Sequence, residues 1–381
     1  MAKSQAKPVV ITGCDVPNSY GYELALRLDH QGYAVFAGCA DCNSIGARSL
    51  ASRGTTNLAI LQIDVTKQDE IDDATEMIND MIGDDGLWAV VNCAESYTVA
   101  EVDWCAMEDF DEIMQVNFLG TVRVTKSLLH LIRKARGRVI NLSSMAGCVS
   151  RAGQAAYSSS KFAIEAFSDS LRQEMLKWGV FVSLVEPAFF PEGNAVLSDS
   201  ETSTRLQRVP KHIKDAYGDE YFTEYIHSVS GTLKRTPSDD PSNPLLPGSQ
   251  SSTLTSGYSS MKSDSSMKHR SPQEKKIAGG KSPTSSLKDP KRQSLTSLPS
   301  SATSTLKSQG SPNLSNTNRV LHALMEAVTS PSPKVRYFVG SFQDRVVKSF
   351  SSLLPTVVMD TYLTSGEVSK VVPKLIKEKT E

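Results

Sequence analysis

The chain of 381 residues lacks an excess of charge of either sign. Its formal net charge is -1, so we expect no folded basic face and no binding of nucleic acid. No stretch approaches the ~20 apolar residues that a helix needs to cross a bilayer. The first apolar run, Val9–Ile11, begins within ten residues of Met1, which leaves no room for a presequence. We therefore expect a cytoplasmic protein without a transmembrane segment, and peripheral contact with a membrane stays open.

Cysteine is also scarce, and none follows residue 148. The six cysteines lie mostly within apolar runs, which is typical of small buried hydrophobic residues in an intracellular protein. The pair Cys39-x-x-Cys42 has the spacing of metal ligands, but no second pair and no histidine accompanies it. We therefore predict no metal site.

Apolar periodicity is missing from about residue 228 to residue 318. Serine, threonine, proline, lysine and glycine dominate this segment, which cannot bury enough apolar surface to offset its ordering entropy. Helical periodicity resumes at Val320, and residues 336–339 are typical of a strand. The sequence predicts one discontinuous domain (1–227 and 319–355), interrupted by a disordered insertion (228–318) and followed by a C-terminal tail (356–381).

Short β-branched runs alternate with amphipathic stretches along the remaining sequence. This alternation predicts an α/β fold: a single Rossmann-type domain with a doubly wound parallel sheet, whose ligand binds at the carboxyl ends of the strands. In the helix expected at 154–177, five apolar residues share one stripe. The expected strands lie near 8–13, 35–37, 58–63, 88–91, 139–142, 181–185 and 336–339, and the expected helices near 20–31, 71–81, 107–133, 154–177 and 320–328.

Ser144, Tyr157 and Lys161 form the strongest candidate for a catalytic site. Tyr157 and Lys161 are four residues apart on a predicted helix, so their side chains share a face. Ser144 lies just past the end of the strand expected at 139–142. A Tyr-x-x-x-Lys pair also arises by chance in core helices, but this one follows a strand end, where an α/β sheet binds its ligand.

The order and spacing of these motifs resemble the short-chain dehydrogenase/reductase family over about residues 8–227 and 319–355. Finer matches, such as residues 120–126 and 217–222, resemble the branch of retinol dehydrogenases, 17β-hydroxysteroid dehydrogenases and D-β-hydroxybutyrate dehydrogenase. The matching residues are Thr12-Gly13, Asp64, Asn92-x-Ala94, Asn117, Ser144, Tyr157-Ser-Ser-Ser-Lys161 and Glu186-Pro187.

The resemblance implies a hydride transfer coupled to proton transfer, with Tyr157 as the acid or base. An unperturbed tyrosine has a pKa near ~10. The Lys161 ammonium and an oxidised nicotinamide would favour the phenolate and lower that pKa. The resemblance further implies that Lys161 also binds the nicotinamide ribose, that Ser144 holds the substrate oxygen, and that Asn117 positions a water that relays protons to Lys161.

The cofactor contacts implied by the resemblance follow the strand ends, but two of the loops depart from the family pattern. Val16 and Pro17 lengthen the loop after the first strand, and Ser19 stands where a glycine is expected. The turn at 92–95 reads Asn-Cys-Ala-Glu in place of Asn-Asn-Ala-Gly. Each change adds bulk beside the dinucleotide, so we expect weakened but not abolished binding. The implied cofactor residues are Gly13, Ser19, Gly21, Asp64, Asn92, Tyr157, Lys161 and Pro187.

Two of these assignments have alternatives. Asp64 could contact the adenine, or cap a helix ahead of Thr66, or do both. The segment Cys39-Ala40-Asp41 follows the second strand and carries no arginine for a 2′-phosphate. NAD(H) is therefore favoured over NADP(H).

The sequence favours a dehydrogenase of a small apolar alcohol or ketone, of the steroid or retinoid class. Two alternatives stay open: a dehydrogenase of a short hydroxy acid such as 3-hydroxybutyrate, and a cofactor-impaired protein with a binding or regulatory role. The second alternative is disfavoured because a non-catalytic protein would need none of the four candidate catalytic residues, Asn117, Ser144, Tyr157 and Lys161. The resemblance also implies a homodimer, paired through the helices that hold Asn117 and Tyr157. The sequence leaves the direction of the reaction open.

Overall fold

Seven parallel strands form one sheet in the computed structural model, which describes residues 6–188, 204–225, 315–351 and 353. The strand order is β3-β2-β1-β4-β5-β6-β7. It runs outward from β1 in one direction and from β4 in the other, which is the doubly wound arrangement that the sequence predicted. The strands are β1 (Pro8–Thr12), β2 (Ala34–Cys39), β3 (Leu58–Gln62), β4 (Ala89–Asn92), β5 (Arg138–Leu142), β6 (Phe181–Pro187) and β7 (Arg336–Val339).

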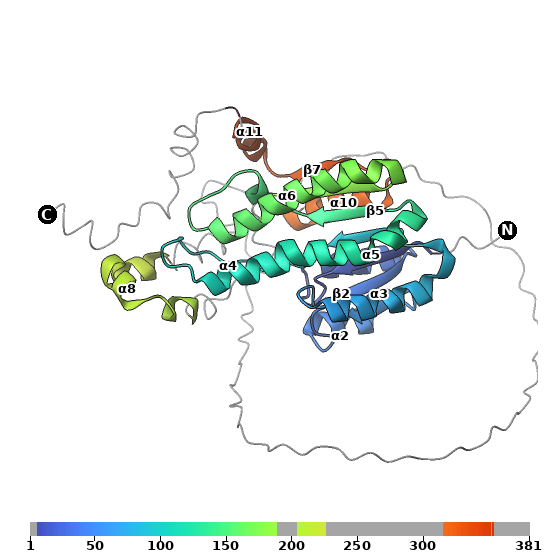
Figure 1. The fold of residues 1–381 in the computed structure, drawn as a ribbon, viewed down its shortest axis with the longest axis horizontal. Coiled ribbons are helices and arrows are strands. Elements are labelled where there is room, and N and C mark those ends of the chain that lie inside the picture. The colour runs from blue at the N-terminus through green and yellow to red at the C-terminus, as the bar shows by residue number, and fades with distance from the viewer. Residues whose placement is uncertain (1–5, 189–203, 226–314, 352, 354–381) are drawn as a thin grey trace, which may run out of the picture. The chain divides into compact units, whose positions relative to one another are not determined.

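Helices cover both faces of the sheet. One apolar core lies between the sheet and helices α1 (Tyr20–His30), α2 (Ile45–Arg53) and α10 (Asn316–Thr329). A second core lies on the opposite face, which is covered by α3 (Gln68–Ile82), α5 (Thr121–Ala135) and α6 (Ala155–Met175) (Figure 1). Because both faces are buried, the central strands contain continuous apolar runs, such as Val9–Ile11 in β1 and Ala89–Val91 in β4.

The helix expected at 107–133 is present, with one irregularity. It begins as α4 (Met107–Ile113), passes through the π-helical segment η2 (Met114–Gly120) and continues as α5. A π-helical turn inside an α-helix often marks a functional position, and Asn117 lies within it. The sequence reasoning did not predict α2, α8 (Lys211–Tyr217), α11 (Phe342–Phe350) or the short turns η1 (Gly83–Asp85), η3 (Met145–Gly147) and η4 (Leu176–Trp178).

The residues that follow the predicted insertion belong to the same sheet as those before it. Strand β7 pairs with β6 in parallel, with Leu184 opposite Arg336. Arg138 on β5 is buried and donates from Nη1 to three carbonyls at the end of α10, those of Ala327, Val328 and Ser330, over 2.7–3.1 Å.

The predicted disorder of residues 228–318 was wrong at its end, because Ser315 caps α10 and residues 316–318 form its first turn. The rest of the predicted insertion and the predicted C-terminal tail lie outside the described residues. The predicted domain bounds likewise stay a prediction. Among the helices that the structure describes, none combines the length and the apolar character needed to span a membrane.

Candidate active site

The structure brings Ser144, Tyr157 and Lys161 together at the carboxyl ends of β4, β5 and β6. Tyr157 and Lys161 both lie on the buried side of α6, with the Lys161 Nζ 5.3 Å from the centroid of the Tyr157 ring. Lys161 also donates to the carbonyl oxygen of Leu142, at the end of β5, over 3.0 Å. Ser144 follows β5, where its hydroxyl accepts from the Ala146 N–H at 3.1 Å. The predicted juxtaposition of the three residues is confirmed.

A fourth residue, Glu95, enters this group and was not predicted as part of it. Its Oε2 atom lies 2.8 Å from the Lys161 Nζ and accepts a hydrogen bond of 3.3 Å from the Tyr157 hydroxyl. The Lys161 side chain is 1% exposed and that of Glu95 10%, so this ion pair is nearly excluded from water. The sequence showed only that Glu95 departs from a glycine, and that departure was interpreted as added bulk rather than as charge.

The pKa of Tyr157 differs from the sequence-based expectation. Burial raises the pKa of the Tyr157 hydroxyl well above its usual value, and the Glu95 carboxylate and the Tyr97 ring raise it further, while Ser144 lowers it. Burial is the largest cause of this raised pKa, and the negative charge of Glu95, which is paired with Lys161, adds to it. The lowering expected from Lys161 together with an oxidised nicotinamide stays a prediction.

Asn117 supports the loop that carries Glu95. Its side-chain amide is fully buried, accepts from the Ser96 N–H at 2.7 Å and donates to the Ser96 carbonyl at 2.9 Å. It also donates to the Ser160 hydroxyl on α6 over 3.0 Å. Asn117 therefore fixes the backbone beside Glu95 to the catalytic helix. Its implied role in relaying protons to Lys161 stays a prediction.

A pocket of about 290 Å³ lies at the carboxyl ends of the strands and is lined by Gly13, Ser19, Asp64 and Glu95 among others. Gly13 has a φ of +75°, and a Cβ atom there would lie 2.7 Å from the Ala94 Cα. At Gly21, a Cβ atom would lie 2.6 Å from the Gly13 carbonyl oxygen. Only glycine fits either position, because the loop after β4 packs closely on Gly13 and the end of β1 packs closely on Gly21 at the start of α1. Their contacts with a dinucleotide stay predictions.

Ser19, which stands in place of a glycine, caps α1. Its hydroxyl accepts from the Tyr22 N–H at 3.3 Å and donates to the Gly13 carbonyl at 3.4 Å. The preceding residues Val16, Pro17 and Asn18 line the same pocket. The loop thus fills part of the space in front of the helix N-terminus, which agrees with the added bulk expected from the sequence.

Of the other three predicted cofactor residues, only Asp64 lines this pocket. Its carboxylate accepts from the N–H and the hydroxyl of Thr66 at 3.0 and 2.7 Å, although the N-cap residue of α3 is Lys67. The Asn92 amide instead donates to Thr125 and Asn141 within the buried core. Pro187 ends β6, and its carbonyl accepts from Ser144 at 3.5 Å. Their contacts with a cofactor stay predictions.

A family model described as short chain dehydrogenase matches residues 7–204. The chain belongs to this family. Bovine (Bos taurus) mitochondrial D-beta-hydroxybutyrate dehydrogenase is 39% identical over 246 residues, which cover 61% of this chain and 71% of the relative. Rat (Rattus norvegicus) 17-beta-hydroxysteroid dehydrogenase type 6 is 40% identical over 232 residues, or 60% and 72% of the two chains. Mouse (Mus musculus) retinol dehydrogenase 16 is 39% identical over 238 residues, or 62% and 74%.

This short-chain dehydrogenase is an oxidoreductase of CH–OH groups that uses a nicotinamide dinucleotide. The nicotinamide, when bound, accepts or donates the hydride. The proton-transfer role of Tyr157 stays a prediction that the geometry allows: a protonated tyrosine hydroxyl can donate its proton to the oxygen of a carbonyl. The hydroxyl of Ser144 lies beside Tyr157 and can donate a hydrogen bond to the same oxygen as charge develops on it.

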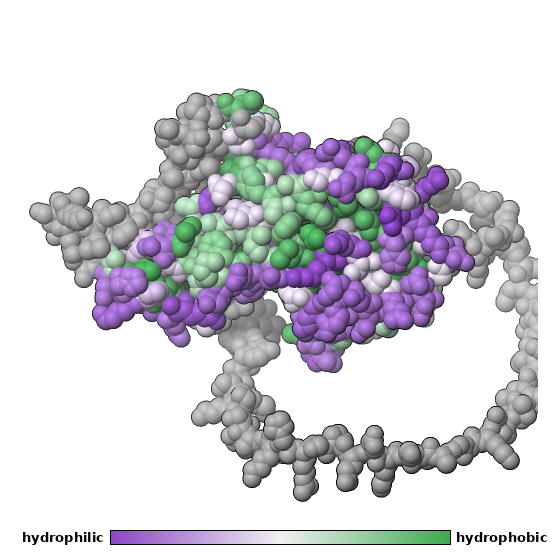
Figure 2. Space-filling model, viewed as in Figure 1, coloured by the Kyte–Doolittle hydropathy of each residue, from purple (hydrophilic) through white to green (hydrophobic). Residues whose placement is uncertain are grey.

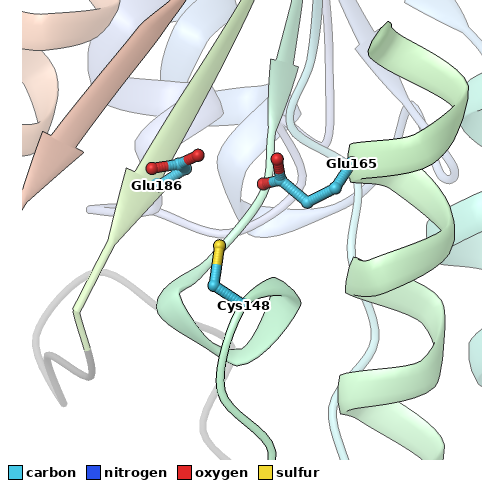
Figure 3. A group of neighbouring side chains, drawn as sticks. All are labelled: Cys148, Glu165 and Glu186. Carbon is cyan, nitrogen blue, oxygen red and sulfur yellow. The ribbon is translucent and has the colours of Figure 1, made fainter. Parts of the chain in front are cut away.

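Cys148, Glu165 and Glu186 form a second polar group of this dehydrogenase, beside η3 (Figure 3). Their sulfur and carboxylate oxygen atoms lie within 4.8 Å of one another. The two carboxylates already have cationic partners: Arg336 contacts Glu165 at 2.9 Å and Glu186 at 3.0 Å, and Lys348 also pairs with Glu186. Burial raises the pKa of the Cys148 thiol to about 11. The group is therefore explained as an ion-pair network that joins α6, β6, β7 and α11.

Proposed function

We propose that this enzyme is an NAD(H)-dependent dehydrogenase of a secondary or allylic alcohol on an apolar molecule, of the steroid or retinoid class. The observation that carries the proposal is an aromatic cluster next to Tyr157. The Tyr97 ring meets the Tyr157 ring edge-to-face at 4.7 Å. Beyond it, residues 204–225 pack on the segment after β4 and bury Trp104, Tyr221, Phe222 and Tyr225.

The aromatic cluster is connected directly to the catalytic helix. The Gln154 amide, at the start of α6, donates to the Tyr97 hydroxyl over 3.1 Å. The Ala100 N–H donates to the Gly153 carbonyl over 2.8 Å, and the Tyr225 hydroxyl lies close to Gly153. The rings of Trp104, Tyr221, Phe222 and Tyr225 are buried against one another and support the segment that carries Tyr97. The half-buried Tyr97 ring beside Tyr157 favours an apolar substrate, because hydrocarbon packs favourably against an aromatic ring and requires no charge partner.

The preference for NAD(H) rests on the charge of the pocket. The carboxylates of Asp15, Asp64 and Glu95 line it, and no lysine or arginine is found among its described lining residues. Ala40, which follows β2, is also part of the lining. A 2′-phosphate would add negative charge without a cationic partner, so NADP(H) is disfavoured.

A short hydroxy acid is the second candidate, and one observation favours it. Such a substrate needs a cation for its carboxylate. Burial raises the pKa of Tyr97 to about 12 although the nearby Arg151 guanidinium acts to lower it, so a cation does lie beside the ring that faces Tyr157. Arg151 is exposed, which weakens this candidate relative to the apolar substrate.

An activity screen of the purified protein separates these candidates. Steroids, retinoids and 3-hydroxybutyrate would each be assayed with NAD(H) and NADP(H), for the parent and for Arg151→Ala. We expect turnover of an apolar alcohol with NAD(H), unaffected by Arg151→Ala. Turnover of only the hydroxy acid, lost in Arg151→Ala, would replace the proposal with the second candidate.

The proposed homodimer is supported by an apolar surface over η2, α5 and α6 (Figure 2). Phe162 on α6 is 45% exposed, and the half-buried Phe118 and Phe167 rings meet at 6.4 Å between η2 and α6. Sedimentation of the parent and of Phe162→Glu tests the dimer, since a charge there should favour the monomer. The cytoplasmic location is likewise a proposal, which imaging of a tagged protein can test; the bovine relative is named as mitochondrial.

A further inference from the structure

The Glu95 carboxylate occupies the inner end of the dinucleotide pocket and contacts both groups that would carry the proton. It lines the pocket together with Gly13 and Val16. A single atom, Oε2, contacts the Lys161 Nζ at 2.8 Å and the Tyr157 hydroxyl at 3.3 Å. Lys161 and Tyr157 therefore both contact a carboxylate that lines the pocket.

The hydrogen-bonding capacity of Lys161 limits what can bind there. An ammonium group has three donors, and Lys161 already uses one for Glu95 and one for the Leu142 carbonyl. One donor is left for a ligand. A ribose offers two neighbouring hydroxyls, so it can contact Lys161 fully only where it replaces the carboxylate.

Charge adds to this competition. Asp15 and Asp64 also line the pocket, and a dinucleotide brings an anionic pyrophosphate. A third carboxylate at the inner end raises the cost of binding and withholds the cation of Lys161 from the ligand.

The surrounding backbone indicates that the Glu95 side chain, rather than its loop, must move. The next residue, Ser96, is held on both its N–H and its carbonyl by the buried amide of Asn117. A rotation about the Glu95 side-chain torsions is the low-cost way to release Lys161, because rotamer changes do not disturb these two bonds.

We propose that Glu95 is a specificity-determining residue of the cofactor site, whose carboxylate competes with the nicotinamide-side ribose for Lys161. Cofactor affinity is set by this exchange: Lys161 gives up Glu95 and gains the ribose hydroxyls. The inference rests on the use of a nicotinamide dinucleotide and not on the identity of the substrate.

Binding calorimetry of the ligand-free protein tests the proposal with three probes: NADH, ADP-ribose and AMP. ADP-ribose has the second ribose without the nicotinamide, and AMP has neither. We expect Glu95→Ala to bind NADH and ADP-ribose at least about tenfold more tightly, the size of one charge-assisted contact. AMP affinity should stay unchanged. Glu95→Gln, which keeps an acceptor for Lys161 without its charge, should show a smaller gain and guards against misfolding of the alanine variant.

Glu112→Ala is the matched control. Glu112 is a carboxylate on α4 that accepts from the Ser96 hydroxyl at 2.7 Å, next to Glu95 but without contact to Lys161 in the described structure. Its removal should leave all three affinities unchanged. An equal gain in Glu112→Ala, an equal gain for AMP, or no gain for NADH in either Glu95 variant would overturn the proposal. The NAD(H) preference is tested separately, by comparing NADH with NADPH on the parent.

Discussion

The two halves of the active site are built differently. The catalytic half places Tyr157 and Lys161 on the buried face of a helix of 21 residues, with Ser144 at the end of the neighbouring strand β5. The cofactor half consists of loops: residues 13–19 after β1 and residues 93–96 after β4. The catalytic half has the family's spacing, whereas the cofactor half has two extra residues and a carboxylate in place of a glycine.

This difference shows where the fold tolerates change. A side chain on the sheet-facing side of α6 is fixed by packing on both sides, so any substitution there disturbs the core. Substitutions in the loops at the carboxyl ends of the strands do not disturb the packing of the core in this way. Changes accumulated in the loops can therefore alter cofactor affinity and the pKa of Tyr157 while the proton-transfer residues stay in place.

The largest expected effect comes from the catalytic half. Tyr157→Phe should lower turnover by about 10²–10⁴-fold or more, because it removes the hydroxyl proposed to exchange the proton with the substrate oxygen, while NADH binding persists. Turnover measures the catalytic half, and the calorimetric affinity for NADH measures the cofactor half. Tyr97→Phe is the control, since the Tyr97 hydroxyl bonds only to Gln154 in the described structure; its loss should cost no more than about tenfold. Near-parental turnover in Tyr157→Phe would refute the assignment.

The next largest effect concerns Glu95, a residue of the cofactor half that contacts Tyr157 in the catalytic half. The rate of alcohol oxidation should rise with pH, because the base form of Tyr157 is populated only as the pH approaches its raised pKa. Removing the negative charge in Glu95→Ala stabilises the phenolate and should lower the apparent pKa of Tyr157. The rising limb of kcat/KM for oxidation then moves to lower pH. An unmoved limb would show that Glu95 does not act on Tyr157.

A smaller effect is expected from the loop after β1. Deleting Val16 and Pro17 together with Ser19→Gly should tighten NADH binding by about three- to tenfold, since these side chains line the pocket in front of α1. Ser19→Gly alone is the control for the lost cap, which costs only a few tenths of a kcal/mol. If the variant with the shortened loop binds NADH no more tightly than the parent, the longer loop does not weaken cofactor binding.

The smallest effect should come from the predicted insertion. Replacing residues 228–314 with a short Gly/Ser loop, which keeps Ser315 and helix α10 intact, should change the melting temperature by no more than ~2 °C, because loop-closure entropy grows slowly with loop length. Calorimetric melting of the two proteins provides the measurement. A large drop would show that the segment contributes to the folded core and would refute the disorder prediction.

Much of the fold was predictable because its strands are apolar runs that end at polar residues. The run at 336–339 was assigned correctly to the sheet although the predicted insertion, about 90 residues long, separates it from the earlier strands. Helix α2 was missed because it buries only Gly46, Ala47 and Leu50, too few apolar residues for a periodic stripe.

Helix α6 shows that apolar periodicity alone does not predict which residues are buried. Of the apolar stripe expected on α6, Leu171 and Met175 are buried, but Phe162 and Ala166 face outward. At this end of the helix the buried positions are taken by Tyr157 and Lys161, because function overrides the apolar pattern there. Glu95 could not be foreseen as a partner of Lys161, since the contact joins the loop after β4 to helix α6 and depends on a side-chain torsion.

Arg138 on β5 connects the part of the domain before the predicted insertion to helix α10, which follows it. Its buried guanidinium binds three carbonyl oxygens at the C-terminus of α10 and lies 4.0 Å from the Trp88 ring, whose own N–H donates to Val328. The C-terminal end of a helix is the negative end of its dipole, so a cation is favourable there. Together with the β6–β7 pairing, this makes the enzyme separable in principle into two polypeptides. A break anywhere between residues 226 and 314 would leave fragments whose mutual recognition is already encoded in α10 and β7.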